Sequence, residues 1–346
     1  MKRFFGFILI ISLISTLFMG CSNESNAVND NKEGDSNSKK IKIVATIFPE
    51  YDFIKNIIKG KEDSYDLKIL MDSGIDLHNF QPSAKDILDV GSSDLFVYVG
   101  GESDKWAESA LKKATNENLK VLNLMELLKD KVKVEELVEG MQEEDEHDRE
   151  EDHDEEQEDG HEEEHDEVEY DEHVWLSLKN AEIICKALEN EIVNLDKENE
   201  NIYRSNSNEY IKQLKSLDGE YKKAVDSSKN KLMLFGDRFP FRYMFDDYNI
   251  QYYAAFLGCS AETEASFETI KFLSDKLTSL KLNYVMKIER SEEKIARAII
   301  ENSEMKDAKI ETMYSIQAVS KEDIEKGNTY LSYMKQNLDV LKKVLN

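Results

Sequence analysis

The chain has 346 residues, 72 acidic and 45 basic, so its formal net charge at pH 7 is −27. Most of this charge is local, because residues 143–172 hold 21 acids and one arginine and leave a net charge of only −7 to the rest of the chain. Without a basic surplus the surface does not attract phosphate backbones, which excludes nucleic acid as a partner. The length suffices for two ordinary domains.

Residues 1–20 have the pattern of an export signal, with a basic start, an apolar run and small residues before Cys21. The end of this segment also resembles a bacterial lipobox, in which Cys21 becomes the lipidated first residue. An ordinary signal peptide with an incidental cysteine is the alternative. We expect attachment to the outer face of the cytoplasmic membrane through lipid on Cys21 alone, with residues 21–40 as a flexible polar tether.

From Ile41 onward, short aliphatic strands alternate with helical patterns. Residues 41–60 have the pattern of a short strand, a loop and a helix, and further strand patterns occur in residues 65–71, 94–100 and 118–128. Pro49 is expected in a loop before the first helix, and Ser83 is placed to cap a helix that begins near Ala84. This alternation predicts a parallel sheet and an N-terminal α/β domain over residues 41–142.

Residues 143–172 are predicted to form a disordered acidic loop rich in histidine. No apolar neighbours surround its four histidines, so no packed core can position them; they are His147, His153, His161 and His165. We expect them to collect metal weakly, and a solvated linker without a metal role is the alternative. His173 differs because apolar residues follow it, so the fold can hold its side chain.

Residues 173–230 are expected to complete the first domain and to provide a long linking helix. Strands and helices then alternate again over residues 231–346, which predicts a second α/β domain. The predicted fold is therefore α/β, with two parallel-sheet domains, a long helix between them and a cleft. Cys185 and Cys259 are expected to be free or buried, and their pairing is left open.

Five motifs occur in order along the chain: VATIFPEYDF (44–53), DLHNFQPSAKDI (76–87), YVGGESDKW (98–106), DEHVWLSLKNA (171–181) and GNTYLSYMKQNLDVLKKVL (327–345). Together they resemble the solute-binding lipoproteins of zinc and manganese ABC transporters. The resemblance runs from about Ile41 to Leu345 and includes the acidic, histidine-rich insertion typical of zinc-selective members. It implies two α/β domains bridged by one long rigid helix, with the metal bound in the cleft between them.

The resemblance also implies a role and two ligands. The role is capture of Zn²⁺, with Mn²⁺ as the alternative, by a monomer that delivers the ion to a permease and its ATPase. His78 matches the first histidine of the family and His173 the second. Two neutral imidazoles from different loops can supply half of a tetrahedral zinc site.

The other half of the predicted site departs from the family pattern. The family commonly has a third histidine where this chain has Gly236, followed by Asp237. A carboxylate usually provides the fourth ligand, where this chain has Tyr314 and Gln317. We expect Asp237 as the third ligand and Gln317 as a neutral oxygen ligand; for Asp237 a helix cap or a salt bridge to a nearby arginine is the alternative. Other acids near loops of the second domain are expected to be structural: Glu262, Glu264 and Glu289.

Two other classes of protein compete with this interpretation. Two histidines and a carboxylate with open coordination can activate water, as in a metal-dependent hydrolase. The sequence offers no nucleophile motif and no general base beyond the ligands, so we do not expect an enzyme. A surface adhesion lipoprotein whose metal is incidental is the second alternative.

Overall fold

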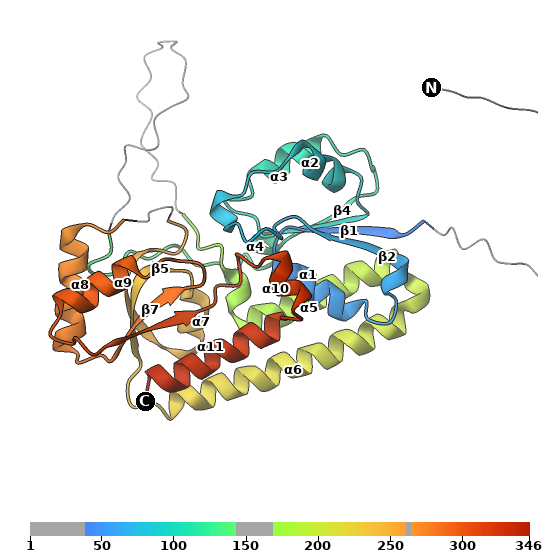
Figure 1. Cartoon of the computed structure of the whole chain (residues 1–346). Coiled ribbons are helices and arrows are strands. Elements are labelled where there is room, and N and C mark those ends of the chain that lie inside the picture. Colours follow the sequence, from blue (N-terminus) through green and yellow to red (C-terminus); the bar gives the residue numbers. More distant parts are fainter. Residues whose placement is uncertain (1–38, 143–168, 261–263) are drawn as a thin grey trace, which may run out of the picture. The chain divides into compact units, whose positions relative to one another are not determined.

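Two four-stranded parallel sheets, one in each half of the chain, form the framework of the protein (Figure 1). The structure is a computed structural model that describes residues 39–142, 169–260 and 264–346. The strand orders are β2-β1-β3-β4 and β6-β5-β7-β8. The strands are β1 (Ile41–Ala45), β2 (Tyr65–Ile69), β3 (Leu95–Tyr98), β4 (Lys120–Asn123), β5 (Leu232–Phe239), β6 (Gln251–Leu257), β7 (Tyr284–Ile288) and β8 (Lys309–Met313). The predicted pair of parallel α/β sheets is confirmed.

The N-terminal sheet is covered on both faces, as parallel sheets require. Alternate residues of its central strand β1 point to different clusters: Ile43 and Ala45 belong to the main hydrophobic core, and Val44 to a smaller one. Helices α2 (Ala84–Gly91) and α3 (Trp106–Lys112) cover the smaller cluster, while α1 (Phe48–Ile57) and α5 (Leu178–Leu195) lie on the other face (Figure 1).

The C-terminal sheet has the same layered arrangement. Helices α8 (Phe267–Ser279) and α9 (Lys294–Asn302) bury one face against Leu234, Ala255 and Phe256. The other face joins the main core, which also contains residues of α7 (Arg242–Tyr248) and α11 (Tyr330–Val344). The main core thus extends through both halves of the chain without interruption.

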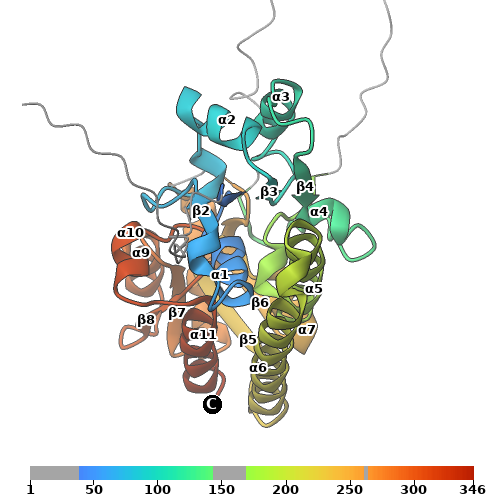
Figure 2. The same cartoon turned by 90° about the vertical axis from the view of Figure 1, so that its right-hand side faces the viewer.

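A long helix, α6 (Glu200–Asp226), links the two halves. Its 27 residues span about 40 Å at 1.5 Å per residue. The segment that leads into and includes this helix is not one continuous helix. It consists of α5, a short 3₁₀ turn (Lys197–Asn199) and α6. Helix α11 runs beside α6 in both views (Figures 1 and 2). Two short helices complete the fold: α4 (Leu124–Leu127) and α10 (Lys321–Glu325).

Asp52 ties the C-terminal helix to the N-terminal half. Its Oδ2 atom accepts hydrogen bonds from the backbone N–H of Tyr330, 3.0 Å away, and from the hydroxyl of Tyr210, 3.2 Å away. Tyr330 opens α11 and Tyr210 lies on α6. Burial raises the pKa of Asp52 to about 6. One carboxylate therefore fastens α1, α6 and α11 together beneath the sheets.

Three local predictions from the sequence can be compared with the structure, and one of them is confirmed. Ser83 caps α2, accepting a hydrogen bond from the N–H of Asp86, as predicted. Pro49 lies in the first turn of α1 rather than in a preceding loop, because the first turn of a helix does not need its N–H. The acidic loop was expected to end at Glu172, whereas Asp171 and Glu172 are both buried.

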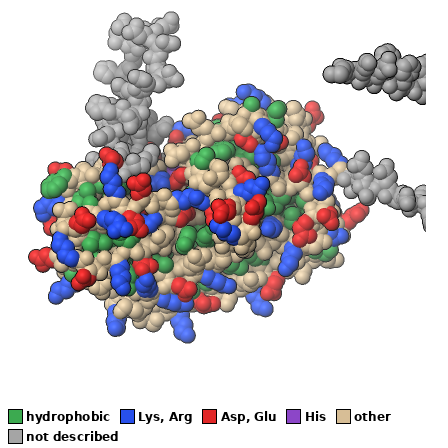
Figure 3. All heavy atoms as spheres, in the orientation of Figure 1, with side chains coloured by type: hydrophobic (Ala, Val, Ile, Leu, Met, Phe, Trp, Pro, Cys, Tyr) green, Lys and Arg blue, Asp and Glu red, His purple; other side chains and the backbone are tan. Residues whose placement is uncertain are grey.

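Several expectations concern residues outside the described ranges: the export signal and most of the tether, the lipidation site Cys21, the acidic segment 143–168 with its four histidines, and Glu262. Within the described ranges, no helix combines the length and apolar character needed to span a membrane. On the face drawn in Figure 3, acidic and basic side chains are interspersed.

Candidate metal centre

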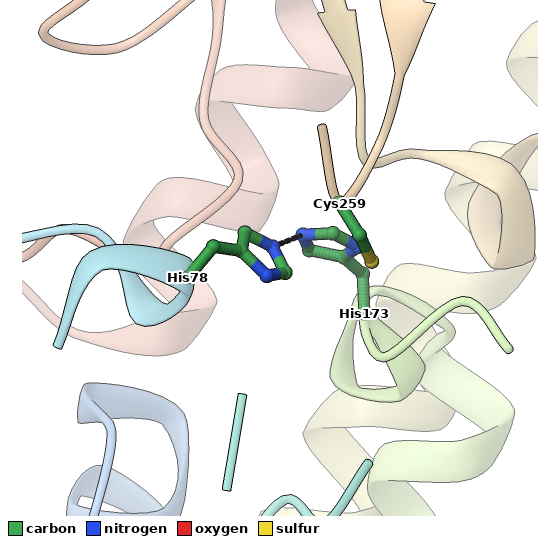
Figure 4. A group of neighbouring side chains, drawn as sticks. All are labelled: His78, His173 and Cys259. Atoms are coloured by element: carbon green, nitrogen blue, oxygen red, sulfur yellow. Dashed lines mark hydrogen bonds between the residues drawn. The ribbon is translucent and has the colours of Figure 1, made fainter. Parts of the chain in front are cut away.

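His78 and His173 face each other where the two halves of the chain meet. His78 lies in the 3₁₀ turn Leu77–Asn79, which follows β2, and His173 directly precedes the 3₁₀ turn Val174–Leu176. Their Nε2 atoms are 3.3 Å apart (Figure 4). Both side chains are buried, with 6% and 0% exposed. Two buried imidazoles whose ring nitrogens lie this close together could supply half of a metal site.

The second ring nitrogen of each histidine is held by a neighbouring side chain. His173 Nδ1 lies 3.0 Å from Asp171 Oδ1, which also accepts the backbone N–H of His173 at 2.8 Å. His78 Nδ1 lies 2.8 Å from Ser103 Oγ, with Glu172 Oε2 3.6 Å away. A carboxylate or hydroxyl on Nδ1 fixes the orientation of the ring and directs Nε2 toward a metal.

The surroundings of the two histidines shift the pKa values of their rings in opposite directions. Burial and then the neighbouring His173 lower the pKa of His78 to about 3. Burial is the strongest single influence on His173 and opposes its charge, but the carboxylates of Asp171, Glu135 and Asp76 together outweigh burial and raise the pKa of His173. Burial raises the pKa of Glu172. His78 is therefore held as the neutral imidazole that a metal requires.

Cys259 completes a cluster with the two histidines. One ligand atom from each of the three residues lies within 4.8 Å of the others. Cys259 follows the carboxyl end of β6, and its sulfur lies beside the His173 ring (Figure 4). Neither Cys185 nor Cys259 forms a disulfide, as expected. The sequence interpretation did not include Cys259 in the site; the signal it overlooked is a cysteine two residues beyond a buried strand.

Gln317, the expected oxygen ligand, lies beside His173. Its Oε1 atom lies 2.8 Å from His173 Nε2, and its Nε2 donates to Asp76 Oδ2 at 2.7 Å. Arg238 donates to the same Asp76 oxygen at 2.6 Å, and Asp76 Oδ1 accepts the N–H of His78. Asp76 therefore positions His78 in one half of the chain and Gln317 in the other.

Asp237, the expected third ligand, does not belong to the cluster. Its Oδ1 accepts the N–H of Arg238 at 2.8 Å, and its Oδ2 accepts the N–H of Ile288 at 3.1 Å. Ile288 ends β7, so this carboxylate pairs with backbone where the register of β5 shifts. Burial raises the pKa of Asp237. The structure thus gives Asp237 a structural role in the sheet.

Gly236 and Tyr314 have structural explanations as well. A Cβ atom on Gly236 would lie 2.8 Å from Cα of Ala296, so close packing of α9 on β5 excludes any side chain there. Tyr314 packs its ring against Tyr333, with ring centroids 5.2 Å apart. The two acids expected to be structural that lie in the described ranges are engaged: Glu264 pairs with Lys294, and Glu289 accepts from Ser315 and Ile316.

Comparison with known proteins now gives the family. The sequence model of ZnuA, zinc-uptake complex component A (periplasmic), matches residues 43–344. The chain belongs to the ZnuA family. The resemblance to metal-transport solute-binding proteins is thereby confirmed, and family membership identifies a binding component rather than an enzyme.

Three relatives illustrate the similarity to the ZnuA family. The high-affinity zinc uptake system protein ZnuA of Bacillus subtilis is 32% identical over 99% of this chain and 98% of its own. The zinc-binding lipoprotein AdcA of Streptococcus pneumoniae is 26% identical over 97% of this chain, which spans 60% of AdcA. The crystal structure of the metal-dependent lipoprotein YcdH of B. subtilis superposes with a TM-score of 0.68 at 27% identity, covering 88% of this chain and 99% of YcdH.

Proposed function

We propose that this chain captures zinc on the outer face of the cytoplasmic membrane and delivers it to the permease and ATPase of an ABC transporter. One observation carries the proposal: two buried imidazole Nε2 atoms lie 3.3 Å apart, each on a ring whose Nδ1 is held by another side chain. Zinc binds imidazole nitrogen well, and one relative is named for zinc uptake and another for zinc binding.

His78 and His173 are the proposed ligands from the N-terminal half of the chain, and Gln317 is a candidate oxygen ligand from the C-terminal half. The 3.3 Å between the two Nε2 atoms suits two ligands each about 2.0–2.1 Å from one zinc ion. Gln317 Oε1 lies on the same nitrogen of His173 that would bind the metal. The ion is cargo, so the site must release it as well as hold it.

An acidic cavity gives a route to these ligands. Its volume is about 250 Å³, and His78 and Cys259 contribute to its wall. Four glutamates also line it: Glu102, Glu135, Glu169 and Glu172. Carboxylates raise the local concentration of cations at a cleft. Glu169 adjoins the segment 143–168, so we propose that the four histidines of that segment collect zinc for this cavity.

We propose attachment of the chain to the membrane by lipid on Cys21, after removal of residues 1–20. Relatives named as lipoproteins support this part.

Zinc uptake tests the function directly. In the native host, deletion of the gene should abolish growth in zinc-depleted medium, and the wild-type chain should restore it. A chain carrying both His78→Ala and His173→Ala should be exported at the same level without restoring growth. Full rescue by that double variant would refute the proposal.

A further inference from the structure

The two described cysteines have very different surroundings. Cys185 lies on α5, is completely buried and belongs to the main hydrophobic core. Cys259 belongs to none of the hydrophobic clusters formed by the described residues and lines the acidic cavity beside His78. A free cysteine usually packs as a small apolar side chain, which accounts for Cys185. It does not account for a thiol among carboxylates and imidazoles.

We infer that Cys259 is the third direct zinc ligand, bound as a thiolate, and that this soft donor makes the site select zinc over manganese. Sγ of Cys259 and one ring nitrogen of each histidine lie within 4.8 Å of one another. Ligands about 2.0 to 2.3 Å from one zinc ion in tetrahedral geometry lie roughly 3.3 to 3.8 Å apart. The widest separation in the cluster must therefore shrink by about 1 Å when the ion binds.

The backbone holds Cys259 in this place independently of any metal. Its N–H donates to Glu135 Oε1 at 3.1 Å. The preceding Gly258 approaches the Phe239–Pro240 backbone so closely that a Cβ atom would lie 2.9 Å from the Phe239 carbonyl oxygen. Glu135 is itself fixed, since its N–H donates to the Glu169 carbonyl at 2.9 Å. The end of β6 is thus docked on the segments that carry the cavity glutamates.

This arrangement explains the departure from three histidines. Close packing on α9 leaves no room for a side chain at Gly236 on β5. The neighbouring strand β6 ends beside the same site and supplies a sulfur donor instead. When the thiol binds zinc, its S–H proton leaves and no oxidant or reductant is needed.

The chemistry of the donor set leads to selectivity. Thiolate suits zinc, whereas manganese prefers carboxylate, carbonyl and water oxygen. A site of two imidazoles, one thiolate and an oxygen ligand therefore favours zinc more than a site with a carboxylate in place of sulfur. This inference rests on the proposed function, because it names a ligand of the same metal centre.

Cobalt(II) substitution tests the sulfur ligand separately from metal binding itself. Cobalt(II) bound to thiolate shows sulfur-to-metal charge-transfer absorption in the near ultraviolet, which nitrogen and oxygen ligands do not produce. The experiment uses the full chain with Cys21→Ser in every variant, so that Cys185 and Cys259 are the only thiols. The first cobalt equivalent should produce the band in this parent and in the control Cys185→Ala. Cys259→Ser should bind cobalt without the band.

Competition between zinc and manganese gives the second readout. Loss of even an outer partner of a metal ligand costs 10–100-fold in affinity, so Cys259→Ser should weaken zinc binding at least about 100-fold. Manganese binding should fall less, so that the preference for zinc drops by about tenfold or more. Cobalt bound in one tight equivalent without the band in the parent would overturn the inference and leave the zinc function standing. Absence of any tight equivalent in the parent would overturn both. If Cys259→Ser does not fold, the charge-transfer band decides the question through the parent protein and the Cys185→Ala control, because Cys259 is then the only thiol left in the control.

Discussion

The proposed ligands His78 and His173 are oriented through their side chains, whereas Cys259 in the C-terminal half is positioned through its main chain. His78 and His173 each have Nδ1 held by Ser103 or Asp171. Cys259 is positioned through its own N–H and the close packing of Gly258. Support by side chains needs fixed residue types, which appear as recognisable motifs. Support through the main chain places no demand on the side chain, so the donor residue can differ within the family. We propose that this chain has a cysteine, Cys259, as such a donor.

The largest effect should come from the two histidines. Replacing either His78 or His173 by Ala should weaken zinc binding by more than about 100-fold, since each supplies a direct ligand. Isothermal titration calorimetry in competition with a chelator measures the change. Asp237→Asn is the matched control, because Asp237 is buried nearby yet its carboxylate is engaged by the N–H groups of Arg238 and Ile288 and by Ser291 rather than by the histidines. Its zinc affinity should stay within about threefold of wild type. A similar loss in Asp237→Asn and His173→Ala would contradict the division between ligands and sheet residues.

A smaller loss should follow removal of a support. Asp171→Asn keeps the size of the side chain but no longer accepts a charge-assisted hydrogen bond from His173 Nδ1 in the same way. Zinc affinity should fall by about 10–100-fold while one equivalent is still bound. Chelator competition gives the affinity, and circular dichroism shows whether the fold persists. Unchanged affinity would mean that the His173 ring is oriented by packing alone.

Much of the N-terminal side could be predicted from sequence, and the reason is local. His78 and His173 stand in short motifs, and the residues that orient them include Asp171, only two positions from His173. The helix cap at Ser83 and the alternation of strands and helices are local for the same reason. These features depend on neighbours in the chain, which a sequence displays directly.

The C-terminal side could not be predicted in the same way. The prediction that Asp237 is a ligand rests on its place next to Gly236, but neighbouring residues of a strand point to opposite faces of the sheet. Its carboxylate consequently reaches the N–H of Ile288 instead of the cleft. Cys259 lies 181 positions after His78 in the chain (259 − 78), and only the fold brings the two residues together. No local pattern reports such a contact.

A third prediction concerns Gly236, which stands where the family commonly has a third histidine. Gly236→His should fail to strengthen zinc binding and should destabilise the fold by about 1–3 kcal/mol, as overpacking usually does. The cause is the 2.8 Å approach between a Cβ at this position and Ala296 Cα. Gly219→Ala on α6 is the control, because a Cβ there meets no atom within 4 Å. It should stabilise the protein by up to about 1 kcal/mol. Thermal unfolding compares the two, and tighter zinc binding by Gly236→His would restore the family pattern against our expectation.

The smallest effect on zinc is expected from a buried acid of the N-terminal half. Both oxygens of Glu289, in the C-terminal half, accept hydrogen bonds, whereas Glu50 Oε1 has no hydrogen-bond partner among the residues that the structure describes. Burial and then the charge of Asp104 raise the pKa of Glu50 to about 8. A carboxyl with a raised pKa binds its proton more tightly in the folded state. The free energy of unfolding should therefore decrease as the pH rises from the ordinary pKa of 4.5 to about 8.

Glu50→Gln should reduce this pH dependence without changing the affinity for zinc. The slope contributed by one such group is at most about 1.4 kcal/mol per pH unit. Asp104, whose pKa is raised to about 7 by burial, contributes in the same direction, so part of the slope should persist. Urea unfolding at pH values between 5 and 8, spaced by about half a pH unit, measures how the free energy of unfolding changes with pH. Identical profiles for wild type and Glu50→Gln would show that Glu50 is ionised in the folded protein.

X-ray absorption at the zinc edge of the full chain, loaded with one zinc equivalent, tests the two-sided metal centre most directly. We expect one shell of two imidazole nitrogens at about 2.0–2.1 Å and one sulfur at about 2.3 Å, with an oxygen ligand completing the coordination. Cys259→Ser should lose the sulfur shell, and His78→Ala should lose one imidazole. A wild-type spectrum that contains only nitrogen and oxygen neighbours would contradict the account.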